Sequence, residues 1–443
     1  MSPTFRALAN PNYRRYAAGG AVSNVGTWMQ RVAQDWLVLQ LATNGALALG
    51  ITTGLQFLPI LLLSPLAGLV ADRVSKRRLL QVTQLMMAGP ALVLGVLAVT
   101  GVAEVWHVYV LALAFGVGTA FDAPARQSFV PELVDHDDLG NAVGLNSASF
   151  NAARVVGPAV AGLLIAAFGG GAVGTGWVIL INAVSYAGPI WALRGIDVSR
   201  LDTPTPAPRG RGGIREGVRY VRGRPDLLLV LAIVFFAGTF GLNFQMTSAL
   251  MATEVFDKGP TEYGLLGTFM AVGSLTGALL AARRTTVRLR LVVAAALLFG
   301  VVEVVAGLLP TYLVFAVWMP LLGVTALTMI TAANTTMQLT TAPELRGRVM
   351  ALYLMIFMGG TPLGAPLVGW VGETFGARWT LVGGGAATVL GVLAATALFA
   401  WSRGVLTLRR RPRNLDNRVW QHQASSRVPD DRRSPVTTRP TSG

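Results

Sequence analysis

Twelve long apolar stretches constrain the fold of this chain of 443 residues more than any other feature of its sequence. A bilayer core about 30 Å thick needs about 20 mostly apolar residues per helix, and each stretch is long enough to cross it. We expect helices, because strands outside a closed barrel would leave backbone groups unpaired in lipid. The predicted spans, with ten to fourteen as the tolerance on their number, are 17–41, 46–71, 79–100, 105–127, 140–168, 176–194, 227–251, 262–282, 290–309, 311–334, 349–372 and 377–401.

The composition excludes most soluble classes of protein. Only 13% of the residues are charged and 53% are hydrophobic, whereas a soluble domain has about a quarter charged residues. The chain has no cysteine and three histidines, which excludes disulfides and thiolate sites and speaks against a metal centre. No H-E-x-x-H, G-x-S-x-G or Walker sequence occurs, so we expect neither a cofactor nor enzymatic activity.

The positive charges fall almost entirely on one side of the predicted bundle. Of the 36 lysines and arginines, 32 lie in segments that share a side with both termini, two lie in the opposite loops and two lie inside spans. Loops rich in lysine and arginine stay in the cytoplasm. We therefore predict a multi-pass protein of the bacterial plasma membrane with both termini in the cytoplasm and the first span retained as a signal anchor. The net charge of +15 is then a topology signal, and no nucleic-acid partner is expected.

A change of composition divides the predicted spans into two sets of six. We expect a six-helix half over 1–194, a cytoplasmic linker over 195–226, a second six-helix half over 227–401 and a basic, disordered cytoplasmic tail over 402–443. The linker contains a proline-rich spacer at 203–208. The residues after it predict a short amphipathic helix on the inner leaflet, and a solvated charged linker is the alternative.

The two halves carry matching elements. Pro-Glu-Leu follows the fourth span at 131–133 and the tenth span at 343–345. The fifth span contains Gly157 and Pro158, and the eleventh contains Gly364, Ala365 and Pro366. Such matches indicate a parallel repeat of two six-helix units, in which the substrate site lies between the units near the membrane midplane.

A glycine, a carboxylate and several basic residues mark the end of the second span and the loop after it: Gly68, Asp72, Arg73, Lys76 and Arg77. A small residue lets two helices approach closely. A carboxylate at the membrane edge can cap a helix or pair with an arginine, so this cluster could latch the two halves in one state and release them in another. The alternative is that the basic residues only anchor the loop on the cytoplasmic side.

This loop resembles the signature G-x-x-x-D-R-x-G-R-K/R of the major facilitator superfamily, with Ser75 in place of a glycine. Residues 13–16, 26–30 and 34–38 resemble the branch that contains enterobactin-exporter-like permeases, or transmembrane secretion effectors. The resemblance covers about residues 5–401. It implies an all-α fold of 12 transmembrane helices, in two six-helix bundles related by pseudo-two-fold symmetry, that works by alternating access.

The fifth span resembles the family's proton-antiporter motif G-x8-G-x3-G-P-x2-G-G. The matching positions are Gly144, Gly157, Pro158 and Gly162, with Ala153 and Ala161 in place of two glycines. In the family this motif accompanies export, whereas small residues in a membrane helix can also serve packing alone. The fourth span lacks the arginine that many proton-coupled relatives carry, which puts the usual coupling scheme in doubt.

Few ionisable residues lie inside the predicted spans, and each is a functional candidate because a charge in lipid is costly. Asp35 lies one turn beyond Arg31 on the same face of the first span, and Arg154 lies at a similar depth in the fifth. We expect these three residues to form one cluster, in which the carboxyl group could take up and release a proton. The alternative is a permanent structural salt bridge. Glu303 in the ninth span is expected to reach the lipid headgroups and to have a structural or incidental role.

Uncharged polar side chains on the expected cavity helices complete the candidates: Asn24, Gln34, Gln56, Asn243, Gln245, Asn334 and Gln338. Such amides can instead join helices to one another. Trp28, Trp36 and Phe57 could give the cavity aromatic walls, although aromatic residues also occupy the membrane interfaces.

The sequence therefore predicts a secondary transporter for a small amphipathic molecule, either drug-like or siderophore-like. We expect a monomer in the lipid bilayer that works by proton-coupled efflux. Uptake or facilitated diffusion is the alternative within the same class, and a membrane enzyme or receptor is the remote one.

Overall fold

The computed structural model describes residues 3–201, 214–282, 289–342 and 345–409. The predicted proline-rich spacer at 203–208, three arginines of the loop after the eighth span, part of the second Pro-Glu-Leu element and the predicted tail from residue 410 lie outside these ranges. Residue contacts divide the chain into two units, 1–399 and 400–443. The described part of the second unit is the end of one helix, which begins in the first unit at Ala377. All other described elements belong to the first unit.

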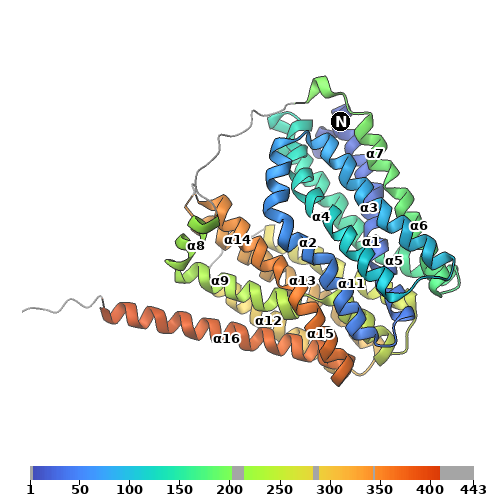
Figure 1. Ribbon diagram of the computed structural model, residues 1–443. Coiled ribbons are helices and arrows are strands. Elements are labelled where there is room, and N and C mark those ends of the chain that lie inside the picture. Colours follow the sequence, from blue (N-terminus) through green and yellow to red (C-terminus); the bar gives the residue numbers. More distant parts are fainter. Residues whose placement is uncertain (1–2, 202–213, 283–288, 343–344, 410–443) are drawn as a thin grey trace, which may run out of the picture. The chain divides into compact units, whose positions relative to one another are not determined.

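The N-terminal half consists of six spans (Figure 1). They are α1 (Pro11–Leu41), α2 (Gly45–Arg73), α3 (Lys76–Val99), α4 (Val105–Leu133), α5 (Leu139–Ala167), and α6 (Ala172–Ser185) with its continuation α7 (Ala187–Arg194). Short 3-10 turns flank them at η1 (Pro3–Ala9), η2 (His136–Asp138) and η3 (Val198–Arg200).

The C-terminal half also has six spans, preceded by the linker helix α8 (Ile214–Arg222). Its first span is built from four pieces: α9 (Pro225–Phe236), the π-helix η4 (Ala237–Gly241), α10 (Phe244–Leu250) and the π-helix η5 (Met251–Val255). The others are α11 (Pro260–Ala282), α12 (Leu289–Leu308), α13 (Tyr312–Thr340), α14 (Arg346–Gly359) with α15 (Thr361–Phe375), and α16 (Ala377–Arg409). No strand occurs in the described part of the chain, so the all-α class is confirmed.

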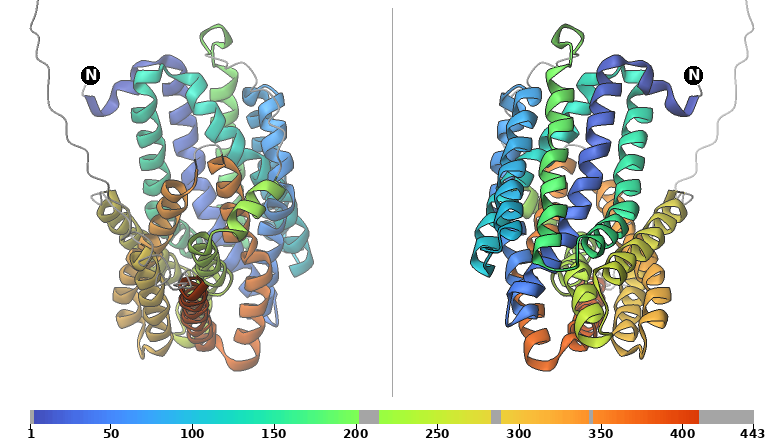
Figure 2. Two further views of the ribbon diagram at one scale, coloured as in Figure 1. Left: turned by 90° about the vertical axis from the view of Figure 1, so that its left-hand side faces the viewer. Right: turned by 90° about the vertical axis from the view of Figure 1, so that its right-hand side faces the viewer.

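Eleven helical segments are long and apolar enough to cross a membrane, as judged from the described residues. The twelfth span, α1, has 31 residues but contains too many polar side chains to qualify. Figure 2 shows α1 (dark blue) running between α5 and the α6–α7 segment, and these helices contact it closely. Because neighbouring helices cover most of its faces, α1 needs less apolar surface than a helix that faces lipid.

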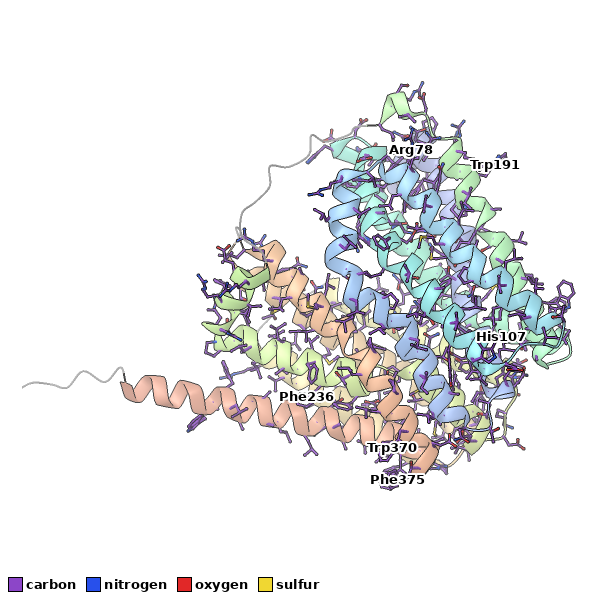
Figure 3. All side chains as sticks on the ribbon, viewed as in Figure 1. Arg78, His107, Trp191, Phe236, Trp370 and Phe375 are labelled. Atoms are coloured by element: carbon purple, nitrogen blue, oxygen red, sulfur yellow. The ribbon has the colours of Figure 1, made fainter. Side chains whose placement is uncertain are left out.

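The outer surface of the bundle is apolar, as lipid requires. Trp191, Trp370 and Phe375 point away from the bundle in Figure 3, and Trp191 is 81% exposed. The ring of Trp370 meets that of Phe375 edge-on, with the ring centroids 6.1 Å apart. Exposed apolar patches of this kind would be unusual on a water-soluble monomer.

The two halves meet along two helix pairs, α2 with α15 and α5 with α11. Glycines make both contacts close: a side chain at Gly50 of α2 would overlap the Ala365 carbonyl, and one at Gly264 of α11 would overlap the Pro158 carbonyl. These glycines lie near the starts of α2 and α11, at the end of the bundle that the charge pattern predicts to be external. From there α2 and α14 run apart toward the predicted cytoplasmic side (Figure 1).

The linker helix packs against the C-terminal half. In α8, Glu216 forms an ion pair with Arg348 of α14, with 2.6 Å between Oε2 and Nη1, and Val221 is buried. The arginines Arg215, Arg219 and Arg222 are exposed. The amphipathic pattern therefore forms a helix that covers protein with one face and leaves its arginines outside.

Candidate functional site

A cavity of about 280 Å³ lies between the two halves. Its size is close to the lower end of the range for small-molecule sites, about 300–1,000 Å³. The N-terminal half contributes lining residues from α1, α2 and α5, and the C-terminal half contributes them from the broken seventh span, α11, α13 and α14–α15. Its walls are mostly apolar and aromatic and include Trp28, Phe57, Phe244, Met246, Met270 and Phe357.

Two arginines flank Trp28 in this cavity. The guanidinium carbon of Arg31 lies 4.7 Å from the centroid of the indole ring, and that of Arg154 lies 5.7 Å from it. Cations at these distances are attracted by the electrons of the ring face. Arg31 and Arg154 come from different helices, so Trp28 brings two of the three predicted cluster members together.

Each of these arginines also bonds to the opposite half. Arg31 Nη1 donates to Gln245 Oε1 at 3.5 Å, and Arg154 Nη2 donates to Ser274 Oγ at 3.2 Å. Arg31 Nε is buried without a partner. The arginine pair is therefore exposed to the cavity and linked to both halves, a position from which it can contact a ligand.

Asp35 lies beside the cavity but does not line it. Its side chain is buried, and Tyr263 Oη of α11 donates to Asp35 Oδ2 at 2.9 Å. No ion pair joins Asp35 to Arg31 or Arg154 among the interactions found in the described residues. The structure thus places Asp35 one turn from Arg31 on α1 and links it to a tyrosine of the other half.

Tyr263 is the residue that connects Asp35 to the cavity. It lines the cavity, stacks on Trp36 with the ring centroids 6.4 Å apart, and its hydroxyl lies 3.3 Å from the Gln245 carbonyl oxygen. One phenolic proton therefore has two acceptors, Asp35 and the Gln245 carbonyl. Sequence reasoning missed Tyr263, because a tyrosine near the end of a span looks like an interfacial residue.

The other predicted cavity residues divide into two groups. Asn243 and Gln245 line the cavity. The remaining amides are not among its lining residues. Gln34 Nε2 donates to Gln56 Oε1 at 3.0 Å and joins α1 to α2. Gln338 donates to Asn334 one turn away on α13, and Asn24 is half-buried.

The antiporter-like residues of α5 lie against two neighbouring helices. Gly157 faces the Trp28 side chain, and a Cβ at Gly162 would overlap the Pro260 carbonyl at the start of α11. Pro158 lines the cavity, and its carbonyl faces Gly264. Gly144 has no close neighbour. The part of the motif around Pro158 therefore belongs to the contact between the halves.

The motif after the second span makes its described contacts within the N-terminal half. Lys76 Nζ lies 2.6 Å from Glu132 Oε1 of α4. Arg77 donates to the carbonyls of Leu193 and Arg194 at 2.6 and 3.0 Å and so caps the end of α7. Arg73 is exposed, and Gly68 has no close neighbour. The Asp72 side chain lies outside the described part of the structure.

Sequence reasoning also missed a buried carboxylate inside the fourth span. Asp122 of α4 accepts hydrogen bonds from Thr83 Oγ1 at 2.8 Å and Gln84 Nε2 at 2.7 Å, and it pairs with Arg126 Nε. The pairing with Arg126 at the i,i+4 spacing was visible in the sequence and could have marked it. These partners satisfy the Asp122 carboxylate, so we assign it a structural role.

The expectation that Glu303 reaches the headgroups is wrong. Its side chain is only 1% exposed and turns into the C-terminal half, where neither carboxylate oxygen has a hydrogen-bond partner among the residues that the structure describes. The sequence gives the position of Glu303 along α12 but not the direction of its side chain, because the residues before and after it on α12 are apolar on every face.

Comparison with known proteins identifies the kind of molecule to which this cavity belongs. The family model described as transmembrane secretion effector matches residues 2–436. The multidrug efflux pump Tap of Mycolicibacterium fortuitum is 31% identical, over 81% of this chain and 89% of that protein. Macrolide efflux protein A of Streptococcus pyogenes is 24% identical, over 83% of this chain and 91% of that protein.

Solved structures agree with this at the level of the fold. A bacterial homologue of the human lysosomal transporter Spinster, in an inward-facing and occupied conformation, superimposes with a TM-score of 0.64 at 18% identity. The match covers 92% of this chain and 99% of that chain. The predicted arrangement of two six-helix bundles is therefore confirmed.

Proposed function

Because the chain belongs to the transmembrane secretion effector family of the major facilitator superfamily, we propose that it exports a small amphipathic molecule from the bacterial cytoplasm by proton-coupled alternating access. The relatives named as efflux pumps support the outward direction. The main support for the proposal is the hydrogen bond between Asp35 and Tyr263, because it joins the two halves beside the cavity.

The chemistry of this bond couples a proton to the relative position of the halves. When Asp35 is ionised, Tyr263 donates its only proton to the carboxylate, as in the structure. When Asp35 is protonated, the carboxyl can donate to Tyr263, whose proton then turns to the Gln245 carbonyl 3.3 Å away. A proton arriving at Asp35 thus changes the bonding between α1, α10 and α11.

The packing of the halves supports alternating access. Close glycine contacts hold α2 to α15 and α5 to α11 toward the predicted external side. On the other side α2 and α14 diverge (Figure 1). We assign this conformation to the inward-open state, in which the cavity receives its substrate from the cytoplasm.

The cavity favours an amphipathic substrate that carries an acidic or hydrogen-bond-accepting group. Aromatic and methionine side chains supply the apolar walls, while Arg31 and Arg154 supply two cations. Guanidinium groups bind carboxylates in a planar, two-point geometry. A carboxylate-bearing, siderophore-like compound is therefore a second candidate beside a neutral, drug-like one.

Transport in everted membrane vesicles tests the proposal. An imposed pH gradient, acidic inside the everted vesicle, should drive accumulation of a substrate from a panel of neutral, cationic and carboxylate-bearing amphipathic compounds. Movement of every substrate in the opposite direction would favour uptake, and movement independent of the gradient would favour facilitated diffusion. Tags at both termini that are protected in intact cells would support the predicted cytoplasmic orientation.

A further inference from the structure

Glu303 is a buried carboxyl group that the proposed transport step does not use. It lies on α12, five residues before the helix ends at Leu308, which places it about 8 Å from that end at ~1.5 Å per residue. Its side chain is 1% exposed. Trp318 Nε1 donates to the carbonyl of Val302, so α13 covers this part of α12.

Two glycines leave the space that the carboxyl group occupies. A Cβ at Gly241 of η4 would come within 2.9 Å of Glu303 Oε2, and a Cβ at Gly384 of α16 would lie 3.2 Å from Oε1. Larger residues at either position would push the carboxyl group aside. Glu303 is therefore enclosed between the π-helix of the seventh span and α16.

No donor or cation satisfies this carboxyl group in the described part of the chain. Both oxygens lack a hydrogen-bond partner. The nearby hydroxyl of Thr388 donates to the Gly384 carbonyl instead. The cation at the start of α16, Arg378, donates to the carbonyls of Gly307 and Leu309, and η4 contains no titratable residue.

An ionised carboxylate is not stable in such surroundings. Transferring a charge from water into a low-dielectric interior without a partner costs far more than a protein's net stability, so the group takes up a proton instead. Glu303 is thus neutral in this conformation. It ionises only if the helices around it rearrange and admit water or a donor.

The element that faces Glu303 also forms a wall of the cavity. Gly238 of η4 lines the cavity, as do Leu242 and Asn243 where the helix is interrupted. Asn243 Nδ2 donates to the carbonyls of Thr239 and Phe240 at 2.9 and 3.3 Å and so closes the end of the π-helix. A change in the π-helix would alter its contacts with Glu303 and with the cavity together.

We propose that Glu303 is a second proton-binding site, located in the C-terminal half and coupled to the cavity through the π-helical break of the seventh span. It holds a proton while η4 has the observed conformation and releases it when the seventh span rearranges around substrate. The coupling rests on the proposed transport function, whereas the presence of the proton does not.

Infrared spectroscopy of the purified full-length protein in lipid nanodiscs tests for the proton directly. The wild type at neutral pH should show the carbonyl band of a protonated carboxylic acid, and Glu303→Gln should lose it. Glu373→Gln is the matched control, because Glu373 is exposed at the end of α15, and it should keep the band. Identical spectra for wild type and Glu303→Gln, or a carboxylate band that responds to added sodium, would overturn the proposal.

A stability measurement tests for the same proton by an independent property. The folded wild type retains a proton that the unfolded chain releases, so its thermal stability should fall as the pH is raised. Glu303→Gln cannot lose a proton and should show a smaller fall, while Glu373→Gln should follow the wild type. Equal pH dependence in all three proteins would contradict a proton on Glu303.

Transport in everted vesicles then tests the coupling. Glu303→Gln should lose gradient-driven accumulation and keep substrate exchange, because the neutral side chain permits the loaded conformation but releases no proton. Unchanged accumulation together with a confirmed infrared band would mean that the proton is only structural, which overturns the coupling. Failure of the wild type to transport in this direction would count against the proposed function and leave the infrared result intact.

Discussion

Asp35 and Glu303 are both buried carboxyl groups in membrane-spanning helices, and they differ in what holds them. Asp35 accepts a hydrogen bond from Tyr263, which belongs to the opposite half of the protein. Glu303 has no hydrogen-bond partner among the described residues and lies within the C-terminal half, between η4 and α16. The surroundings of Asp35 therefore depend on how the two halves meet, whereas those of Glu303 depend on the shape of one span.

The two carboxyl groups therefore respond to different motions of the protein. Separation of the halves on the predicted external side would break the bond to Tyr263 and change the environment of Asp35. The same rigid-body motion would leave Glu303 enclosed, and only a local change at the π-helix would open its site. Asp122 differs from both, because Thr83, Gln84 and Arg126 of the same half satisfy its carboxylate. Neither of these two motions would change its surroundings.

The largest effect is expected from Asp35→Asn. Asparagine keeps the size of the side chain but cannot carry a proton, so gradient-driven transport should fall to the level of vesicles without the protein. Exchange of substrate across the membrane should persist. Asp135→Asn, an exposed residue of the loop before α5, is the control with the same chemical change. Gradient-driven accumulation that survives in Asp35→Asn would remove Asp35 from the coupling step.

A smaller effect is expected from Tyr263→Phe. The change removes the donor to a buried carboxylate, and an unmet hydrogen bond of this kind costs about 1–3 kcal/mol. Transport should slow by roughly tenfold, and its optimum should move to higher pH because the ionised form of Asp35 loses its stabilising partner. The pH profile of the transport rate measures both. Tyr312→Phe is the control, because its hydroxyl donates to the Glu262 carbonyl, and it should leave the pH profile unchanged. An unchanged pH profile for Tyr263→Phe would contradict the role of the bond.

Gly264→Ala is expected to change the contact between the halves beside Asp35 without changing the surroundings of Glu303. The added methyl group would overlap the Pro158 carbonyl and loosen the contact between α11 and α5. Because the chain has no cysteine, spin labels at Arg78→Cys and Arg346→Cys can report the distance between the halves on the predicted cytoplasmic side. We expect that distance to shorten while the infrared band assigned to Glu303 stays the same. Gly89→Ala, where a methyl group meets open space, should change neither, and a loss of the Glu303 band in Gly264→Ala would show that the two sites are not independent.

The smallest effect on transport is expected from Asp122→Asn. The change weakens the pairing with Arg126 and should lower the free energy of unfolding by about 1–3 kcal/mol. Thermal denaturation in detergent measures that loss. Transport per folded molecule should stay at the wild-type rate, and a loss of proton coupling in this variant would mean that a saturated carboxylate can also carry the proton.

Individual residues show which features of the structure could be predicted from the sequence and which could not. The helical class follows from segments such as α12, whose 20 residues are apolar except for Arg290 and Glu303, and which therefore suit the lipid core. A cluster of Asp35, Arg31 and Arg154 was predicted from their depth; the structure brings the two arginines to Trp28 and bonds Asp35 to Tyr263 instead. The partner of Asp35 was not predictable, because Tyr263 lies 228 positions away in the sequence.

The approximate number of membrane spans, the family and the predicted side of the charged loops could all be inferred from the sequence. These follow from the cost of placing polar groups in lipid, which acts on each segment separately. The hydrogen-bond partners of the buried carboxyl groups could be identified only from the three-dimensional structure. They depend on how each helix is rotated and which distant spans approach it, and both follow from packing between side chains far apart in the chain. A sequence places Glu303 and Gly241 on two different helices; only their packing puts the carboxyl group of one against the backbone of the other.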